Sequence, residues 1–146
     1  MTTMTKSVRI ITSILASLML FAGVVKFFEP IKTNFYFQIR ESQLPFPTFS
    51  QWAGQFGEIA VGLTLFMLVF FWKKIPSTIG TKVFYISNIL VIFILAVTIF
   101  VHVHPSVQAE ILPMKSKPPF ISIFMLLLVG VSLFLHKRAT NTTTIV

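Results

Sequence analysis

Glu58 is the residue best placed to do chemistry, because it is the only acidic side chain inside an apolar stretch of the sequence. A carboxylate within a membrane costs several kcal/mol unless it is paired or faces a wet cavity. Glu58 follows Trp52 by six residues, which places it roughly 9 Å deeper along a helix. It shares one helical face with Gln55 and Gly62. We therefore expect Glu58 to face the interior of a helix bundle.

Two further helices are predicted to bring polar side chains to the same depth. Lys26 lies at the end of the first apolar stretch, where its ammonium can meet Glu58. Thr98 and His102 share a face near the end of the third stretch. With Gln55, these side chains predict a polar pocket in the outer half of the bundle. Two interpretations stay open: a ligand or proton site, or an ion pair that only fixes the helix register.

Other catalytic chemistry finds little support in the sequence. The chain contains no cysteine and no aspartate, which excludes thiol chemistry, and it has no Gly-rich phosphate loop. His102 and His104 stand two residues apart, so a helix would point them to different faces, and we predict no metal site. Whether the chain is an enzyme stays open, with the balance against it.

The composition predicts the class of protein. Apolar residues make up 55% of the 146 residues, charged residues only 11%, and the mean hydropathy is +0.86. Such a chain cannot cover a water-facing surface. Four apolar stretches predict an all-α, integral membrane four-helix bundle in one domain, residues 1–146. The predicted spans are 10–28, 56–72, 83–103 and 120–135, and the predicted outer loops are 29–55 and 104–119. We expect these loops to lie on the outer membrane surface and to cap the bundle, and short interfacial helices within them stay open.

The net charge of +8 predicts membrane orientation and not nucleic-acid binding, because the cations flank the apolar stretches. One side collects seven cations and no acid: Lys6, Arg9, Lys73, Lys74, Lys82, Lys137 and Arg138. The other side has five cations together with Glu29, Glu41 and Glu110. The positive-inside rule therefore predicts that the N- and C-termini are cytoplasmic. His136, beside Lys137, is predicted to be an interfacial cap.

A short set of motifs resembles the DoxX-like family of small bacterial four-helix membrane proteins. The cues are Ala22-Gly23 before Lys26-Phe27, and Gly57-Glu58 before Gly62. The most specific part is an outer-loop motif, which consists of His104, Pro105, Glu110, Pro113, Lys117, Pro118 and Pro119. The resemblance implies a multi-pass protein of the bacterial cytoplasmic (inner) membrane. Some members of that family are linked to quinone-coupled oxidation of sulfur compounds or to redox-stress complexes.

Three functions are compatible with these features. The first expectation is a non-catalytic subunit or anchor of a membrane complex, with a redox protein or another membrane protein as partner. The second is a component that acts on a quinone or another lipid-soluble substrate at the polar pocket. The third is transport of a small solute, which would require a homo-oligomer because four short spans enclose little space. No cofactor is evident apart from the candidate quinone, and the lipid bilayer is the expected surroundings.

Overall fold

The computed structural model describes residues 4–143, and every regular element in them is helical. The long elements are α1 (Lys6–Val25), α2 (Ile31–Glu41), α3 (Pro47–Phe71), α4 (Ser77–Val103) and α5 (Phe120–Thr143). Three short 3-10 turns connect them, η1 (Trp72–Lys74), η2 (Ala109–Ile111) and η3 (Pro113–Lys115). Among the described helices, four are long and apolar enough to cross a membrane: α1, α3, α4 and α5. This is the architecture of a multi-pass membrane protein.

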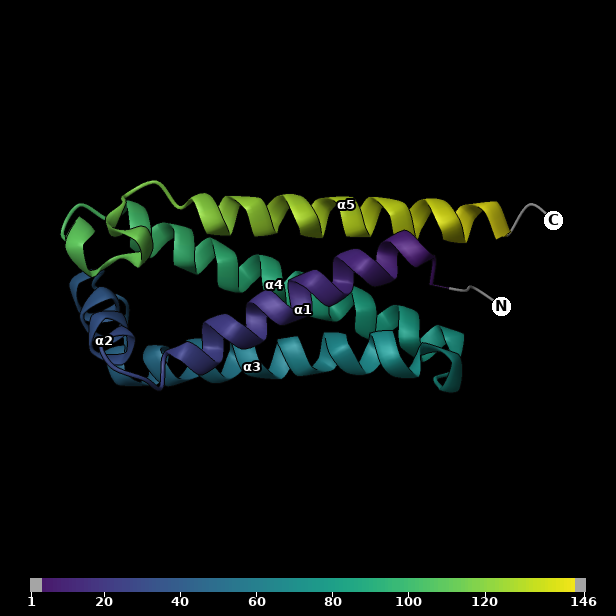
Figure 1. The fold of residues 1–146 in the computed structure, drawn as a ribbon, viewed down its shortest axis with the longest axis horizontal. Coiled ribbons are helices and arrows are strands. Elements are labelled where there is room, and N and C mark those ends of the chain that lie inside the picture. Colours follow the sequence, from purple (N-terminus) through teal and green to yellow (C-terminus); the bar gives the residue numbers. More distant parts are fainter. Residues whose placement is uncertain (1–3, 144–146) are drawn as a thin grey trace.

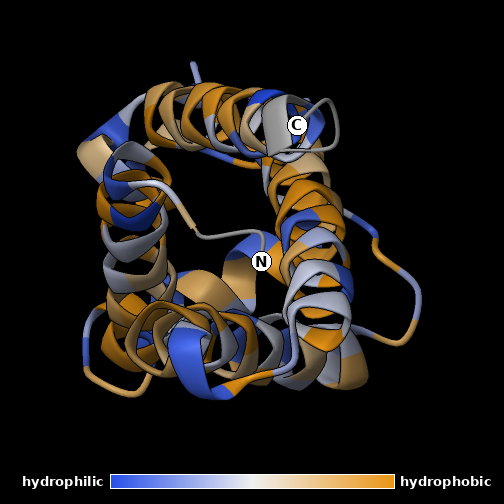
Figure 2. Cartoon of the chain, turned by 90° about the vertical axis from the view of Figure 1, so that its right-hand side faces the viewer, coloured by the Kyte–Doolittle hydropathy of each residue, from blue (hydrophilic) through white to orange (hydrophobic). Residues whose placement is uncertain are grey.

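The four long helices form a ring in which each helix packs against two others. α3 contacts α4, α4 contacts α5, and α1 closes the ring by lying against both α3 and α5. Figure 2 shows this ring from one end, with apolar residues dominating all four helices. The start of α1, the end of α5 and η1 lie at one end of the bundle, here called the terminal end (Figure 1). α2 and the segment 104–119 lie at the opposite end, here called the loop end (Figure 1).

α1 and α3 form the most extensive helix pair, because small residues let their backbones approach. A Cβ atom on Gly62 would lie 2.9 Å from the backbone nitrogen of Leu20 and 3.1 Å from the carbonyl oxygen of Ala16. Neither backbone atom can move aside as a side-chain end could. Gly62 is therefore required for this close approach.

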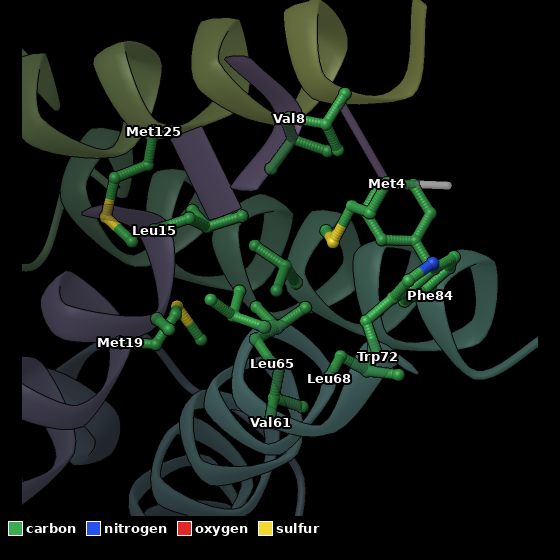
Figure 3. Close-up of a cluster of buried hydrophobic side chains, with 14 of the residues drawn as sticks. Met4, Val8, Leu15, Met19, Val61, Leu65, Leu68, Trp72, Phe84 and Met125 are labelled. Atoms are coloured by element: carbon green, nitrogen blue, oxygen red, sulfur yellow. The ribbon is translucent and has the colours of Figure 1, made fainter. Parts of the chain in front are cut away.

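The apolar core lies between the helices in the middle and terminal half of the bundle. Leu15, Leu65, Phe84 and Val91 are fully buried, and Val129 is nearly so. Figure 3 shows Leu15, Met19, Leu65 and Met125 turned toward one another from three helices. In a bilayer, lipid covers the many apolar side chains that point outward, so this narrow core is what holds the helices together.

The predicted loop at 29–55 contains a short helix, which the sequence analysis left open, and its predicted end is wrong. Residues 31–41 form α2, and α3 begins at Pro47, well before the predicted start at 56. Proline is tolerated there because the first helical position needs no N–H donor. Phe46 precedes it with φ of 50°, which turns the chain sharply into the helix.

At the terminal end, the other spans extend past their predicted bounds, whereas α1 ends at Val25, before its predicted end at 28. α1 begins at Lys6, α4 begins at Ser77, and α5 continues to Thr143. Each extension adds polar or charged residues that lie at the terminal end of the bundle (Figure 1). A span predicted from hydropathy ends where polar residues begin. The helix itself continues, because long charged side chains can reach the membrane interface.

Candidate functional site

Lys26 and Glu58 form an ion pair near the loop end. The Lys26 Nζ atom lies 2.6 Å from each of the two carboxylate oxygens of Glu58. The two side chains are only 15% and 7% exposed. Charge-assisted hydrogen bonds of this length are the strong ones among protein hydrogen bonds. The pair therefore neutralises a charge that the membrane interior would otherwise penalise.

The position of Gly23 explains why the two charges meet. A Cβ atom on Gly23 would lie 3.0 Å from the carbonyl oxygen of Gln55 and 3.2 Å from the Cβ of Glu58. The backbone of α1 thus touches α3 at this level. Lys26 is the C-cap of α1, about one turn beyond Gly23. Its side chain is long enough to turn back onto Glu58.

α2 covers the ion pair from the loop end. The Lys26 Nζ atom lies 4.2 Å from the centroid of the Phe35 ring, which is a cation–π distance. Phe35, Gln38 and Ile39 are the buried side chains of α2. They follow helical spacing, so α2 presents one apolar face to the bundle. The sequence analysis placed this segment in an outer loop and did not use its helical spacing, so it did not place Phe35 beside the ion pair.

Gln55 lies one turn before Glu58 on α3 and leaves one polar group unsatisfied. The residue is 2% exposed. Among the described residues, its amide nitrogen Nε2 has no hydrogen-bond partner. A buried amide donor without an acceptor is uncommon in native proteins and calls for an explanation. The Nε2 group of Gln55 therefore indicates that a hydrogen-bond acceptor binds near the ion pair.

His102 is a buried residue in the last turn of α4. Its Nδ1 atom is 2.9 Å from the carbonyl oxygen of Thr98. Because a carbonyl only accepts, Nδ1 carries the proton, and Nε2 of the neutral ring is an acceptor. The ammonium groups of Lys26 and Lys117 both act electrostatically on His102. We call Lys26, Gln55, Glu58 and His102 the loop-end site.

Thr98 joins this site only through its backbone. Its hydroxyl donates to the carbonyl oxygen of Ile94 at 2.9 Å, within the same helix. Such back-bonding is the common arrangement of threonine in apolar helices. The hydroxyl proton of Thr98 is therefore engaged, and its oxygen can still accept a hydrogen bond.

The outer-loop motif closes the loop end through Lys117. Its Nζ donates to the carbonyl oxygens of His104, at 2.8 Å, and of Val107. Gln38 of α2 donates to the carbonyl oxygen of Ile111. The backbone N–H of Gln108 lies 3.4 Å from a carboxylate oxygen of Glu41. These contacts hold the segment 104–112 against α2.

The remaining motif residues do not reach the ion pair. Pro105, Glu110, Pro113 and Pro118 are exposed, and Pro119 is buried at the start of α5. His104 is half-buried, and its ring lies 5.5 Å from that of Phe100. Within residues 4–143, no group of three or more His, Cys, Asp or Glu side chains could hold a metal ion.

The sequence analysis predicted that His136 is an interfacial cap, and this prediction is wrong. It is 2% exposed, and three aromatic rings surround it. The ring centroids of Trp72, Phe84 and Tyr85 lie 5.8, 4.4 and 5.7 Å from that of His136. Its neighbours in sequence, Lys137 and Arg138, are exposed. The charged neighbours suggested an exposed position for His136. Successive residues of α5 point to different sides of the helix, so His136 is buried while Lys137 and Arg138 are exposed.

Comparison with known proteins adds no family assignment: the chain matches no family model, no curated protein and no solved structure.

Proposed function

We propose that the chain is a multi-pass protein of the bacterial cytoplasmic membrane with both termini in the cytoplasm. The distribution of charge supports this orientation. The terminal end carries seven cations without an acid, including Lys73 and Lys74 in η1 and Lys82 near the start of α4. Short, cation-rich connections stay cytoplasmic. The loop end, which carries Glu29, Glu41 and Glu110, then faces the outside. The resemblance to the DoxX-like family agrees with this location.

We further propose that the loop-end site binds the head group of a quinone or a similar lipid-soluble molecule. The unpartnered Nε2 of Gln55 carries this proposal. A quinone carbonyl is a hydrogen-bond acceptor and would satisfy that donor. The Nε2 atom of His102 is an acceptor, which suits the hydroxyl of the reduced form. We assign binding to these residues and no electron transfer.

Aromatic side chains on the bilayer-facing surface support a planar ligand. The rings of Trp52 and Phe56 stack at 5.6 Å, and Phe27 lies 6.0 Å from Phe56. All three side chains are exposed. Phe27 follows Lys26 and Phe56 follows Gln55, so the cluster borders the loop-end site. Aromatic rings at this depth are typical of the membrane interface, and they offer a flat ligand a surface for stacking as it enters.

The test is a fluorescence titration of the purified full chain in detergent with a short-chain ubiquinone analogue. Quinones quench tryptophan, and Trp52 lies in the aromatic cluster. We expect saturable quenching, with binding about tenfold weaker in Gln55→Leu, which removes one buried hydrogen bond. Gln51→Leu is the matched control, because Gln51 lies one turn earlier on α3 and is only half-buried. Unsaturable quenching, or equal affinity in the two variants, would contradict the proposal.

A second candidate function is a non-catalytic subunit or anchor of a membrane complex. The ion pair favours this second function because its charges are already satisfied within the chain. The ammonium of Lys26 donates to both carboxylate oxygens of Glu58 and lies over the ring of Phe35. Such a pair joins α1, α2 and α3 without a ligand. Native mass spectrometry of gently extracted protein separates the two functions. A stoichiometric partner protein without bound quinone favours the anchor. Transport of a small solute by an oligomer stays an expectation from the sequence.

A further inference from the structure

A second cluster of buried polar side chains lies in the half of the bundle near the termini. It consists of Thr12 from α1, Asn88 from α4, and Ser132 and His136 from α5. All four residues are at most 2% exposed. We call this group the terminal-half site. Of these four residues, the sequence analysis assigned a role only to His136, which it predicted to be an interfacial cap.

Helix packing places these side chains at adjacent levels. The rings of Phe84 and His136 lie 4.4 Å apart, so these residues stand opposite each other on the antiparallel helices α4 and α5. Asn88 and Ser132 are each one turn further into the bundle. The hydroxyl oxygens of Thr12 and Ser132 are 3.4 Å apart. Three helices therefore bring polar groups to one small region of an apolar core.

The orientation of the Asn88 amide is fixed by its own helix. Its Nδ2 donates to the carbonyl oxygen of Phe84 at 2.8 Å. Reversing the amide would place two acceptors against each other, so this orientation holds. Its Oδ1 then points away from Phe84. Among the described residues, Oδ1 has no hydrogen-bond partner.

His136 supplies the second unsatisfied group. In the part of the chain that the structure describes, its Nε2 has no hydrogen-bond partner. The rings of Trp72, Phe84 and Tyr85 lie around its imidazole. Two buried polar atoms without partners, one turn apart in depth, indicate a shared ligand that offers both donors and acceptors.

We propose that the terminal-half site binds water. A buried water molecule needs two to four polar partners, and the site offers Asn88 Oδ1, His136 Nε2 and the hydroxyls of Thr12 and Ser132. Water donates to Asn88 and either donates to or accepts from His136, so both groups are satisfied. This water exchanges with the aqueous phase at the terminal end, and His136 is the group through which protons exchange.

Toward the loop end, the terminal-half site is bounded by buried apolar side chains. Leu15, Leu65, Val91 and Val129 are buried next to it on four helices, and we call them the apolar layer. On α1 and α4 the apolar layer lies between the terminal-half site and the loop-end site. The water site is therefore independent of quinone binding.

Substituted-cysteine accessibility tests the proposal, because the natural chain has no cysteine. Ser132→Cys is nearly isosteric, and Val129→Cys is the matched control in the apolar layer on the same helix. The full chain in membranes is exposed to Ag⁺, which stays in water and needs a thiolate. The readout is the loss of maleimide labelling after denaturation. We expect the thiol at 132 to react at least tenfold faster than that at 129, and Asn88→Leu to abolish the difference.

A second measurement uses the unaltered chain with ¹⁵N-labelled histidine. Magnetisation transfer from water to the imidazole of His136, assigned by its loss in His136→Gln, is the expected result in nuclear magnetic resonance spectra. Equal slow reaction at 132 and 129, together with no transfer from water to His136, would overturn the proposal. Reaction at both positions would also overturn it, since the apolar layer would then be wet.

Discussion

The ammonium of Lys26 contacts both carboxylate oxygens of Glu58 at 2.6 Å, and these residues come from α1 and α3. The connection between them contains α2, whose Phe35 lies over the ammonium. The pair thus ties together all elements of the first half of the chain. It sits at the point where Gly23 brings the backbones of α1 and α3 into contact. Its removal should affect folding as well as any bound ligand.

Lys26→Met should destabilise the fold by about 3–5 kcal/mol, because it leaves the carboxylate of Glu58 buried and unpaired. Glu58→Gln should cost less, since Lys26 lies at a helix end and its ammonium can extend to the interface. The measurement is denaturant unfolding in detergent micelles. The control is the double variant Lys26→Met with Glu58→Leu, which should recover most of the loss. Additive losses in the double variant would mean that the two charges do not stabilise each other.

Gly62→Ala should destabilise the fold by about 1–3 kcal/mol, because the new methyl group meets the backbone of α1. Gly130→Ala is the matched control, since a Cβ atom there meets nothing within 4 Å. The control should be neutral or stabilise α5 by up to about 1 kcal/mol. Thermal unfolding of both variants in the same detergent checks the comparison. Equal behaviour of the two would argue against the close approach of α1 and α3.

Lys117→Met should loosen the segment 104–112, because the carbonyl oxygens of His104 and Val107 lose their donor. Hydrogen–deuterium exchange followed by mass spectrometry should show faster exchange in this segment and little change in α1 or α3. Lys115→Met is the control, since Lys115 is exposed on the same connection. Equal hydrogen–deuterium exchange of the segment 104–112 in the two variants would show that Lys117 does not hold this segment in place.

Single cysteines should report the orientation of the bundle. Ser77→Cys, at the terminal end, should react with a membrane-impermeant maleimide only after the cells are opened, as expected for a cytoplasmic position. Ser106→Cys, at the loop end, should react in intact cells. Both serines are exposed, so accessibility differs only by the side of the membrane. The reverse pattern would invert the proposed topology.

The sequence was sufficient for the four long helices and for the meeting of Lys26 with Glu58. Hydropathy marks each span, and a lone intramembrane carboxylate requires a partner that only a few residues can supply. The start of α3 was predicted too late because Pro45 and Pro47 suggested a loop, although proline is compatible with the first turn of a helix. The cover of α2 over the ion pair depends on the chain folding back onto the bundle, which local pattern does not encode.

His136 shows a different limit of sequence reasoning. The charged residues that follow it suggested the interface, yet its ring lies among Trp72, Phe84 and Tyr85. Those rings come from η1 and α4, far from His136 in the chain. Burial of this kind is set by tertiary contacts, so no window around His136 could predict it.

The apolar layer has an electrical consequence. Leu15, Leu65, Val91 and Val129 form a dry section between polar groups near the two surfaces. A transmembrane potential falls mainly across the section that water does not enter, so the field would concentrate there. Carrying one elementary charge through it would involve about 2.3 kcal/mol for each 100 mV. In the proposed arrangement, each polar site exchanges protons with its own side of the membrane, and the apolar layer between them acts as an insulator.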